Sequence, residues 1–406
     1  MATIRPFKAI RPPRDKAHLL ASRSYVSYSD KTLKEKLENN PYTFLHIINP
    51  EYKKKNKKSG IEKYQLVKEK FEDFLKSGNL IQDEKAAFYL YQQQKGKHIF
   101  QGIIAASSVQ DYLNGSIKIH EHTITEREEM FKNYLDVTGF NADPVLLSYK
   151  GNFIIQSLIN KISKSRAEYN FTTTNKVQHQ LWKIFAEDEI KIISKTFSKI
   201  DKIYIADGHH RSASSALLAK KRKANKEANC NYFMSCLIDE KQLHIINFNR
   251  LVKNLNGLSS SDFVEKIKTK FEVSKISSTV FNPRKKDEIS MYLNGKCYCL
   301  IAKEGAFKAD CVSKLDPAIL SNNILFPILG IKDEKTNKNI TFESGTTPLS
   351  EIKNRVDNRE FAVAFILKPI PIKTLKEVAD KGKIMPPKST YIEPKLRSGL
   401  TIYPID

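Results

Sequence analysis

Residues 201–219, which read DKIYIADGHHRSASSALLA, combine residue types that can bind a phosphate group. A short apolar stretch predicts a strand, and Asp207 and Gly208 after it predict a turn in which glycine supplies a positive φ. The run SASSALLAK then predicts a helix with a face of small residues. A helix that begins at such a turn directs unpaired backbone N–H groups and the positive end of its dipole to one point. This arrangement is typical of a phosphate-binding turn.

The side chains of this turn add charge to the backbone donors. Arg211 carries a planar, permanently charged guanidinium that suits phosphate or carboxylate groups, and His209 and His210 add imidazoles. The alternative is an ordinary strand-to-helix connection with a basic cluster on the surface. Five consecutive residues of these types directly after a strand favour the phosphate-binding interpretation.

A second group of chemically capable residues is Lys-Ile-His-Glu-His at 118–122. On a strand, His120 and His122 would share one face and Glu121 would take the other. At the end of the strand this alternation relaxes, and Glu121 can then reach a pocket. A carboxylate placed there can accept the proton of an attacking hydroxyl group.

Three other interpretations of this segment stay open. It can be the solvated polar end of a strand, or the start of a helix in which a threonine caps the first turn. It can also supply metal ligands together with the DGHHR turn, although the spacing lacks the short His or Cys pairs of zinc sites. The capping residues would be Thr123 or Thr125, with Glu126 or Glu128 nearby. The metal ligands would be His120, His122, Asp207 and His209 or His210.

The elements that would position these residues are a mixture of helices and strands. Apolar residues at helical spacing predict a helix over 61–75, and residues 86–109 predict a β-hairpin with its turn at 95–97. Residues 155–198 are expected to be mostly helical. We expect an α+β fold in three parts: an N-terminal α+β region at 1–115, a core at 116–250 with a helical insertion at 151–200, and a C-terminal α+β region at 251–406.

The composition of the 406 residues is that of a globular protein, because 40% are hydrophobic and 10% aromatic. The chain lacks a long uninterrupted apolar run, and its start lacks the apolar segment of a signal peptide. We therefore expect a cytoplasmic protein with no membrane partner. Its five cysteines lack zinc-like pairs and are expected to be reduced and structural, with Cys297 and Cys299 on one face of a strand.

The formal net charge of +23 bears on the class of partner. Basic clusters occur at 53–58 (KKKNKK) and 220–226 (KKRKANK), as in some nucleic-acid-binding proteins. Lysine is nevertheless spread along the whole chain, and aromatic residues do not interleave with the clusters as a base-stacking surface requires. We therefore expect a lysine-rich solvated surface, no specific nucleic-acid partner, and a positive field that favours small anionic substrates.

Several motifs follow one another in a set order: H-E, then EREEMFKNYL, then VTGFNADPVLL, and later IADGHHRSASSALL. This order resembles the ParB/sulfiredoxin-like fold and, within it, the nucleotide-dependent kinases of free serine. Those kinases carry a glutamate at the corresponding place and a D-G-x-H-R phosphate loop. The resemblance implies that the catalytic residues are Glu121, Asp207 and His210. The phosphate- or nucleotide-binding residues would be Gly208, His209, His210 and Arg211, with His209 at the variable position.

Over most of its length the chain also resembles a widespread bacterial family long described as a domain of unknown function. Members of that family often lie beside genes of phosphorylated serine biosynthesis. The matching stretches are IRPFKAIRPP, NPYTFLHIINP, the H-E-H-T segment, DGHHR, NRLVKNL and MPPKSTYIEPKLRSGL. The chain departs from the short kinase form by about 50 residues inserted at 151–200.

The resemblance implies a phosphotransferase that acts on free L-serine or phosphoserine, either as a serine kinase or, in reverse, by phosphoserine dephosphorylation. Mg²⁺ and ATP or ADP would be its cofactors, and Asp207 could hold the Mg²⁺ directly or through water. Two interpretations of the tail stay open: it can supply a second contact to an anion, or it can be an ordinary surface loop. The residues of that contact would be Lys388, Ser389, Thr390 and Lys395.

Two other functional classes remain as alternatives. One is a non-catalytic nucleotide- or DNA-binding regulator of the ParB type, and the other is a hydrolase that uses a metal held by histidines. Against the first, ParB proteins have G-E-R-R where this chain has D-G-H-H-R, and no clear helix-turn-helix pattern follows. The sequence leaves open the direction of phosphoryl transfer and the oligomeric state.

Overall fold

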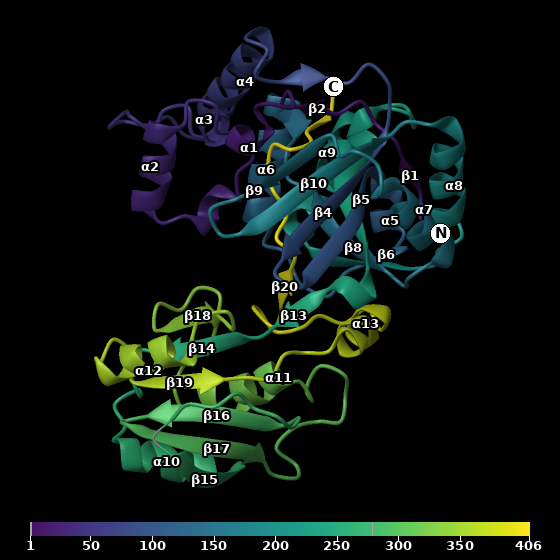
Figure 1. The fold of residues 1–406 in the computed structure, drawn as a ribbon. Coiled ribbons are helices and arrows are strands. Elements are labelled where there is room, and N and C mark those ends of the chain that lie inside the picture. Colours follow the sequence, from purple (N-terminus) through teal and green to yellow (C-terminus); the bar gives the residue numbers. More distant parts are fainter. Residues whose placement is uncertain (1, 278) are drawn as a thin grey trace. The chain divides into compact units, whose positions relative to one another are not determined.

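The computed structural model describes residues 2–277 and 279–406 (Figure 1). The chain forms two compact units. The first unit contains the segment up to Ile119, Thr123–Leu243 and Pro394–Asp406, and the second contains His120–His122 and His244–Glu393. Strands and helices alternate in both units, which confirms the α+β class. The division into three parts expected from the sequence stays a prediction.

The first unit is built on a nine-stranded mixed sheet. Its strands are β1 (Ile4–Arg5), β4 (Phe88–Lys95), β5 (His98–Ser108), β6 (Ile117–Lys118), β8 (Val145–Tyr149), β9 (Tyr169–Thr172), β10 (Val177–Ile184), β11 (Ile203–Asp207) and β12 (Tyr232–Asp239). The order is β6-β11-β8-β12-β5-β4-β10-β9, and β1 pairs with β5 beside this path. Two pairs are parallel, β11 with β6 and β12 with β8. The other pairs are antiparallel.

Both faces of this sheet are buried, which explains the apolar character of its central strands. In β4, Phe88 and Leu90 join one cluster of buried side chains, whereas Tyr89 and Tyr91 join another. Because successive side chains of a strand point to opposite faces, the two clusters lie on opposite sides of the sheet. The predicted hairpin is confirmed as β4 and β5, with its turn at residues 96–97.

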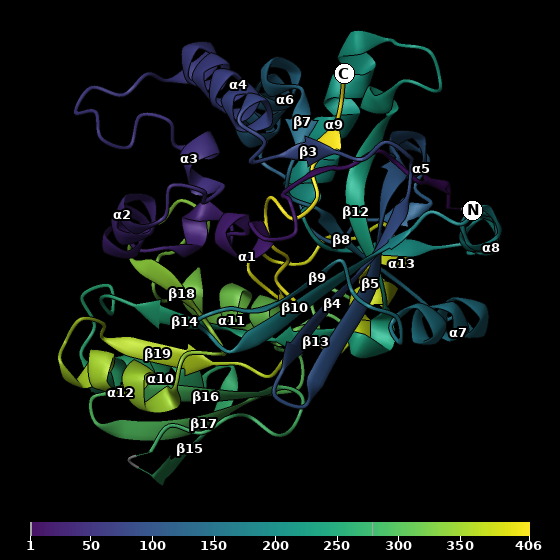
Figure 2. The same ribbon diagram turned by 45° about the horizontal axis from the view of Figure 1, so that its top comes forward.

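The first unit also contains nine α-helices among the described residues, some of which cover its sheet. They are α1 (Ala17–Leu20), α2 (Asp30–Asn39), α3 (Leu45–Ile48), α4 (Gly60–Lys76), α5 (Val109–Leu113), α6 (Thr125–Thr138), α7 (Phe153–Ile162), α8 (Glu187–Phe197) and α9 (His209–Arg222), with short 3-10 turns at Tyr25–Ser27, Asn229–Asn231 and Glu240–Gln242. α7 and α8 contribute Ile155 and Phe197 to the first cluster. α6 and α9 pack against each other, as Figure 2 shows.

The helix predicted over 61–75 is confirmed as α4, whose apolar residues at helical spacing bury Val67, Phe71 and Phe74. These side chains share a small core with the N-terminal segment and the C-terminal tail. Two short antiparallel pairs complete the unit: β2 (Ile10–Arg11) with β3 (Ile81–Gln82), and β7 (Phe140–Asn141) with β21 (Tyr403–Pro404). The tail is therefore an ordered part of the first unit.

The second unit contains a six-stranded antiparallel sheet with the order β15-β17-β16-β19-β14-β18. The strands are β14 (Phe248–Val252), β15 (Phe271–Ser277), β16 (Glu288–Leu293), β17 (Lys296–Ala302), β18 (Ile340–Ser344) and β19 (Val363–Ile366), and β13 (His244–Ile246) pairs with β20 (Tyr391–Glu393). The helices are α10 (Ser260–Lys268), α11 (Asp316–Leu320), a π-helical turn (Ser321–Leu325), α12 (Leu349–Asp357) and α13 (Ile372–Asp380). Cys297 and Cys299 both lie buried on β17, and all five cysteines are free thiols.

The expectation of a mostly helical segment over 155–198 is wrong for its middle. There β9 and β10 extend the sheet at one edge, between α7 and α8. The strand β10 reads VQHQLWKI, and its residues alternate between buried and half-buried from Val177 to Leu181. That alternation is typical of a strand, but the buried His179 is polar, and the apolar helix α7 and the amphipathic helix α8 on either side favoured a helical interpretation.

Candidate functional site

The turn between β11 and α9 has the predicted strand, glycine turn and helix. Gly208 is the N-terminal capping residue of α9 and has φ 106°, a conformation that favours glycine. A Cβ atom at this position would lie 3.0 Å from the guanidinium of Arg211. Glycine is therefore needed here both for the backbone conformation and for the room that the arginine occupies.

Asp207, at the end of β11, pairs with two cations. Its Oδ2 accepts a hydrogen bond from Arg211 Nη2 at 2.6 Å, and its Oδ1 accepts one from Lys395 Nζ at 2.6 Å. Burial raises the pKa of Asp207, but the charges of Lys395 and Arg211 outweigh it and bring the pKa down to about 2. The carboxylate therefore stays ionised at neutral pH and holds both cations at the turn.

The two ion pairs of Asp207 affect its suitability as a ligand of the expected Mg²⁺ ion. Each oxygen of Asp207 already binds a cationic side chain, so Mg²⁺ at this carboxylate would lie beside two positive charges. The described residues contain no group of three or more His, Cys, Asp or Glu side chains that could hold a metal ion. The side chains of this turn thus fit an anion better than a protein-bound cation.

Arg211 is oriented by a second contact as well as by Asp207. Its Nη1 donates to the carbonyl oxygen of Pro144 at 2.5 Å. Pro144 belongs to the N-A-D-P-V motif that directly precedes β8, the neighbour of β11 in the sheet. Two motifs that are 67 residues apart in the chain therefore meet at this arginine.

The small residues of α9 let the helix start inside the fold. Ser212, Ser214 and Ser215 are buried, and each hydroxyl donates to the carbonyl oxygen four residues earlier in the helix. These bonds satisfy hydroxyl groups that would otherwise be costly to bury. His209 is buried and His210 is half-buried in the first turn.

Lys395 comes to this turn from the C-terminal tail. The carbonyl oxygen of Lys395 accepts a hydrogen bond from Gln93 Nε2 of β4 at 3.0 Å, while its Nζ reaches Asp207 of β11. The tail thereby links two strands that are four places apart in the sheet order. Of the tail residues predicted as an anion contact, Lys395 lies at the turn.

The other three residues of that predicted contact lie in the second unit. Lys388 is exposed, with its Nζ 5.4 Å from the centre of the Phe248 ring. The hydroxyl group of Ser389 donates to the carbonyl oxygen of Pro386 at 2.7 Å, and Thr390 is half-buried. The structure thus divides the predicted tail contact between the two units.

The segment His120–His122 is grouped with the second unit. The strand before it, β6, ends at Lys118, so the expected alternation of the two histidines on a strand does not apply. His120 is buried and its carbonyl oxygen accepts from the Met385 backbone N–H at 2.9 Å, whereas His122 is exposed and Glu121 half-buried.

The expected threonine cap of the following helix is wrong. The N-terminal capping residue of α6 is Ile124, and no side chain caps it. The hydroxyl of Thr123, one residue earlier, instead donates to the Glu128 carboxylate in the first turn. This hydrogen bond connects the residue before the cap of α6 to the first turn of the helix, but it satisfies no backbone N–H group.

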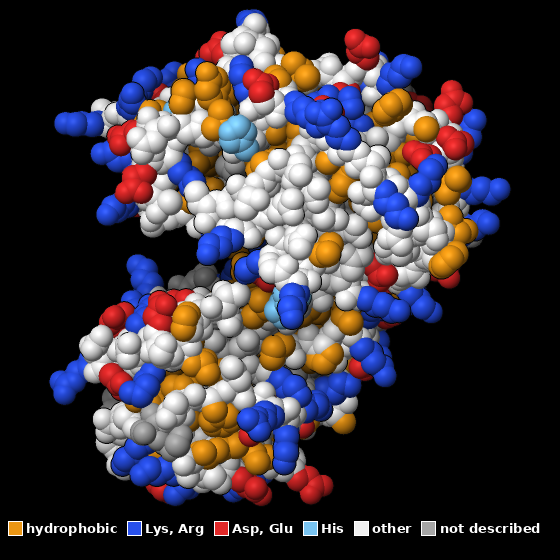
Figure 3. Space-filling model, in the orientation of Figure 1, with side chains coloured by type: hydrophobic (Ala, Val, Ile, Leu, Met, Phe, Trp, Pro, Cys, Tyr) orange, Lys and Arg blue, Asp and Glu red, His pale blue; other side chains and the backbone are white. Residues whose placement is uncertain are grey.

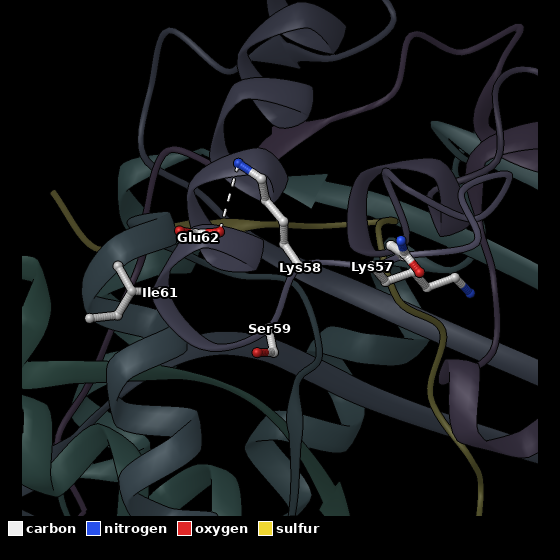
Figure 4. A pocket seen from close by; sticks show the side chains of 6 residues that line it. Lys57, Lys58, Ser59, Ile61 and Glu62 are labelled. Atoms are coloured by element: carbon white, nitrogen blue, oxygen red, sulfur yellow. Dashed lines mark ion pairs between the residues drawn. The ribbon is translucent and has the colours of Figure 1, made fainter.

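The charge on the surface is dispersed. Figure 3 shows Lys and Arg side chains spread over the visible faces of both units, mixed with acidic and apolar side chains. One open hollow of about 620 Å³ lies at the start of α4 (Figure 4). It is lined by exposed residues that include Lys57, Lys58 and Glu62, and it contains none of the predicted site residues.

Comparison with known proteins places the chain in a family. A model of the family described as "Protein of unknown function (DUF1015)" matches residues 4–318. The chain belongs to this family. The match confirms the resemblance expected from the sequence motifs. No curated protein matches this DUF1015 chain.

Solved structures similar to this DUF1015 chain include a free serine kinase in complex with AMP, which is 12% identical with a TM-score of 0.39 and covers 74% of this chain and 91% of its own. SbnI with a C-terminal truncation, from Staphylococcus aureus, is 14% identical with a TM-score of 0.40, covering 74% and 87%. A conserved hypothetical protein from Pyrococcus furiosus is 14% identical with a TM-score of 0.37, covering 74% and 95%. At these identities, and at TM-scores below 0.5, we draw no conclusion about this chain from the likeness.

None of the helices in the described part of the chain has the length and apolar composition needed to cross a membrane.

The sequence motifs missed one charged residue of the tail, Arg397, which is buried against β10. Its only signal in the sequence is its place two residues after Lys395, since no local pattern reveals that an arginine will be buried.

Proposed function

We propose that this protein is a nucleotide-dependent phosphotransferase acting on free L-serine or phosphoserine, with the turn at residues 207–211 binding a phosphate group. The observation that carries the proposal is the cluster at this turn. A glycine with positive φ opens α9, and Asp207 holds Arg211 and Lys395 beside it. Backbone donors, the helix dipole and two cations then act on one anion.

These residues would not need to form a covalent bond with the substrate. Phosphoryl transfer depends mainly on neutralising the charge of the phosphate and on aligning the attacking and leaving oxygen atoms. In the proposal, Arg211 and Lys395 neutralise charge on the phosphate oxygens. The N–H groups of the first turn of α9 donate to the same oxygens. Asp207 does not react; it holds the two cations in place. Mg²⁺, when it accompanies the nucleotide, would be held by phosphate oxygens and water.

Glu121 is proposed as the group that accepts the proton of the serine hydroxyl. The support is the resemblance to free-serine kinases, which carry a glutamate at this place. Glu121 is half-buried in the structure. His210 is proposed as a further contact to phosphate from the first turn of α9.

Phosphorus NMR tests the reaction directly. The purified full chain is incubated with L-serine and ATP, with phosphoserine and ADP, and with phosphoserine alone, each with Mg²⁺. A phosphoserine signal in the first mixture assigns a serine kinase, and inorganic phosphate in the third assigns a phosphatase. Unchanged spectra in all three, from protein shown to be folded, would reject the proposal.

A further inference from the structure

Asp143 is a half-buried carboxylate that has no cationic partner among the described residues. It lies between β7 and β8, directly before Pro144. Its Oδ1 accepts a hydrogen bond from the Ser398 hydroxyl, and its backbone N–H donates to Asn141 Oδ1 at 3.2 Å. No ion pair in the described part of the chain includes Asp143. Its negative charge is therefore not neutralised within that part of the chain.

The other buried or half-buried aspartates of the first unit provide the contrast. Three of them form ion pairs with lysine or arginine, and two accept hydrogen bonds from backbone N–H groups. The three are Asp83, Asp136 and Asp207, and the two are Asp111 and Asp239. Taking a carboxylate partly out of water is costly unless a charge or several donors compensate for it. The Asp143 carboxylate has one hydroxyl donor, so a positively charged ligand would complete its environment.

The distance from Asp143 to the turn at 207–211 is limited by covalent geometry and one hydrogen bond. The carbonyl oxygen of Pro144 accepts from Arg211 Nη1 at 2.5 Å. Consecutive Cα atoms are about 3.8 Å apart, and a carbonyl oxygen lies about 2.4 Å from the Cα of its own residue. The Cα of Asp143 therefore lies within about 9 Å of Arg211 Nη1.

The tail connects Asp143 to the same turn from a second direction. Ser398, whose hydroxyl donates to Asp143, follows Lys395 by three residues. Lys395 in turn donates to Asp207 at 2.6 Å. Asp143 is thus linked through printed contacts of its neighbours to both cations that Asp207 holds. One carboxylate oxygen of Asp143 is fixed by Ser398, and the other makes no hydrogen bond to a described residue.

The dimensions of a phosphorylated amino acid fit this spacing. In phosphoserine, four single bonds separate the phosphorus from the ammonium nitrogen, so these atoms are at most about 5 Å apart. A hydrogen bond at each end adds about 3 Å. A phosphate bound at Arg211 therefore brings the ammonium group within reach of Asp143. That ammonium group would also lie near two cationic side chains, and their repulsion has to be offset by a nearby negative charge.

We propose that the Asp143 carboxylate binds the ammonium group of the amino-acid substrate while the turn at 207–211 binds the phosphate group. The inference rests on the proposed function and names a residue that sets its specificity. Asp207 does not fill this role, because each of its oxygens already binds a cation. An ammonium group donates charge-assisted hydrogen bonds, which a carboxylate oxygen accepts. Asp143 would therefore distinguish an amino acid from the corresponding acid without an amino group.

Calorimetry with two probes at pH 7 tests the ammonium subsite. The probes are O-phospho-L-serine and 3-phosphooxypropionate, which differ only in the ammonium group. The wild-type protein should bind phosphoserine about 10- to 100-fold more tightly, the range of a charge-assisted hydrogen bond. Asp143→Asn keeps the size of the side chain and removes its charge. It should abolish most of this preference without weakening the binding of 3-phosphooxypropionate.

Further variants separate ligand binding from a structural role. Ser398→Ala removes the hydroxyl that orients the carboxylate and should reduce the preference by about 2- to 5-fold, because the charge remains. Asp201→Asn removes an exposed carboxylate just before β11 and should leave both affinities unchanged. If Asp143→Asn does not fold, Asp143→Glu replaces it; this variant moves the carboxylate by one methylene and should also reduce the preference. Thermal unfolding checks each variant.

The outcomes separate this inference from the proposed function. A wild-type protein that binds ADP but does not prefer phosphoserine overturns the ammonium subsite alone. A preference that survives in Asp143→Asn overturns it as well. Equal losses for both probes in this variant have the same effect, because they assign Asp143 to holding the tail. A folded wild-type protein that binds neither ADP nor either probe overturns both proposals.

Discussion

Asp207 holds two cationic side chains at the turn between β11 and α9. Its carboxylate binds Arg211 through one oxygen and Lys395 through the other. One negative charge thus holds two positive side chains, and the cluster keeps a net positive charge toward a ligand. An aspartate that a motif suggests as a metal ligand can therefore position cationic side chains instead.

Substitution of Arg211 tests the turn at the scale of one residue. Arg211→Ala should weaken ADP binding by about 1.5–3 kcal/mol, because hydrogen bonds to a charged group contribute on that scale. Titration calorimetry measures the change. Lys220→Ala, an exposed cation near the end of the same helix, is the matched control and should leave ADP affinity unaltered. Equal affinities for Arg211→Ala and the wild type would count against the phosphate-binding turn.

Substitution of Glu121 tests the proposed base. Glu121→Gln should leave folding and ADP binding intact and reduce turnover by about 10²–10⁴, the usual contribution of general-base catalysis. Glutamine is nearly isosteric, so the loss can be assigned to proton transfer. Glu126→Gln, in the exposed first turn of α6, is the control.

Substitution of the two histidines beside Glu121 tests the alternative mechanism, in which a metal ion is held by histidines. If Glu121→Gln stays active while His120→Ala and His122→Ala lose activity together with bound metal, a metal mechanism replaces the proposal. If none of the three substitutions changes turnover, the catalytic site lies elsewhere.

At the scale of elements, α11 in the second unit begins with a buried carboxyl group. Asp316 is the first residue of this short helix and accepts the backbone N–H of Asp287 at 3.1 Å. Burial, with a smaller contribution from the charge of Asp287, raises the pKa of Asp316 to about 6. The folded chain therefore binds this proton more tightly than the unfolded chain does.

This pKa predicts a pH dependence of stability. Because the folded pKa lies above the unfolded value, the stabilisation is fully present below about pH 4 and is lost as the pH rises through about 6. Asp316→Asn, which can still accept the Asp287 N–H, should raise the free energy of unfolding at pH 7 by up to about 3 kcal/mol, and by almost nothing at pH 4.

Thermal unfolding of the two proteins between pH 4 and 8 measures this difference. Asp310→Asn is a control of opposite sign, because hydrogen bonds to the exposed Asp310 carboxylate lower its pKa to about 2. That substitution should cost stability at pH 7 and not raise it. A difference between Asp316→Asn and the wild type that is constant across this pH range would contradict the prediction.

At the scale of the whole molecule, lysine and arginine residues that give the net charge of +23 are spread along the whole chain, and they are dispersed over the face that Figure 3 shows. Dispersed charge attracts polyanions without reading their sequence, since base readout needs side chains placed in a groove. It also raises the local concentration of small anions such as nucleotides and phosphorylated metabolites.

DNA binding should accordingly be weak and strongly dependent on salt. A fluorescent duplex should bind at low ionic strength with little preference for sequence, and the affinity should fall steeply as salt rises to physiological levels. Fluorescence anisotropy at several salt concentrations, with two unrelated duplexes, measures both properties. Nanomolar, sequence-selective binding at physiological salt would favour the regulator over the enzyme.

The sequence alone determined the elements whose signals are local. The strand, turn and helix around Gly208, the helix α4 and the hairpin of β4 and β5 follow from apolar spacing and turn residues within each segment. The same reasoning failed at residues 169–184. The apolar helix α7 and the amphipathic helix α8 flank these strands, and a window that includes both periods favours neither clearly.

Only the tertiary structure decided which distant residues share the site. Lys395 reaches Asp207 across 188 positions, and Arg397 reaches His179 across 218. Local sequence carries no record of such contacts, because they depend on how the sheet orders its strands and on where the tail crosses it. The motif predicts an anion site at Gly208–Arg211, and this stays a prediction. The fold determined that the tail brings a second cation to that turn and buries a third that has no carboxylate partner among the described residues.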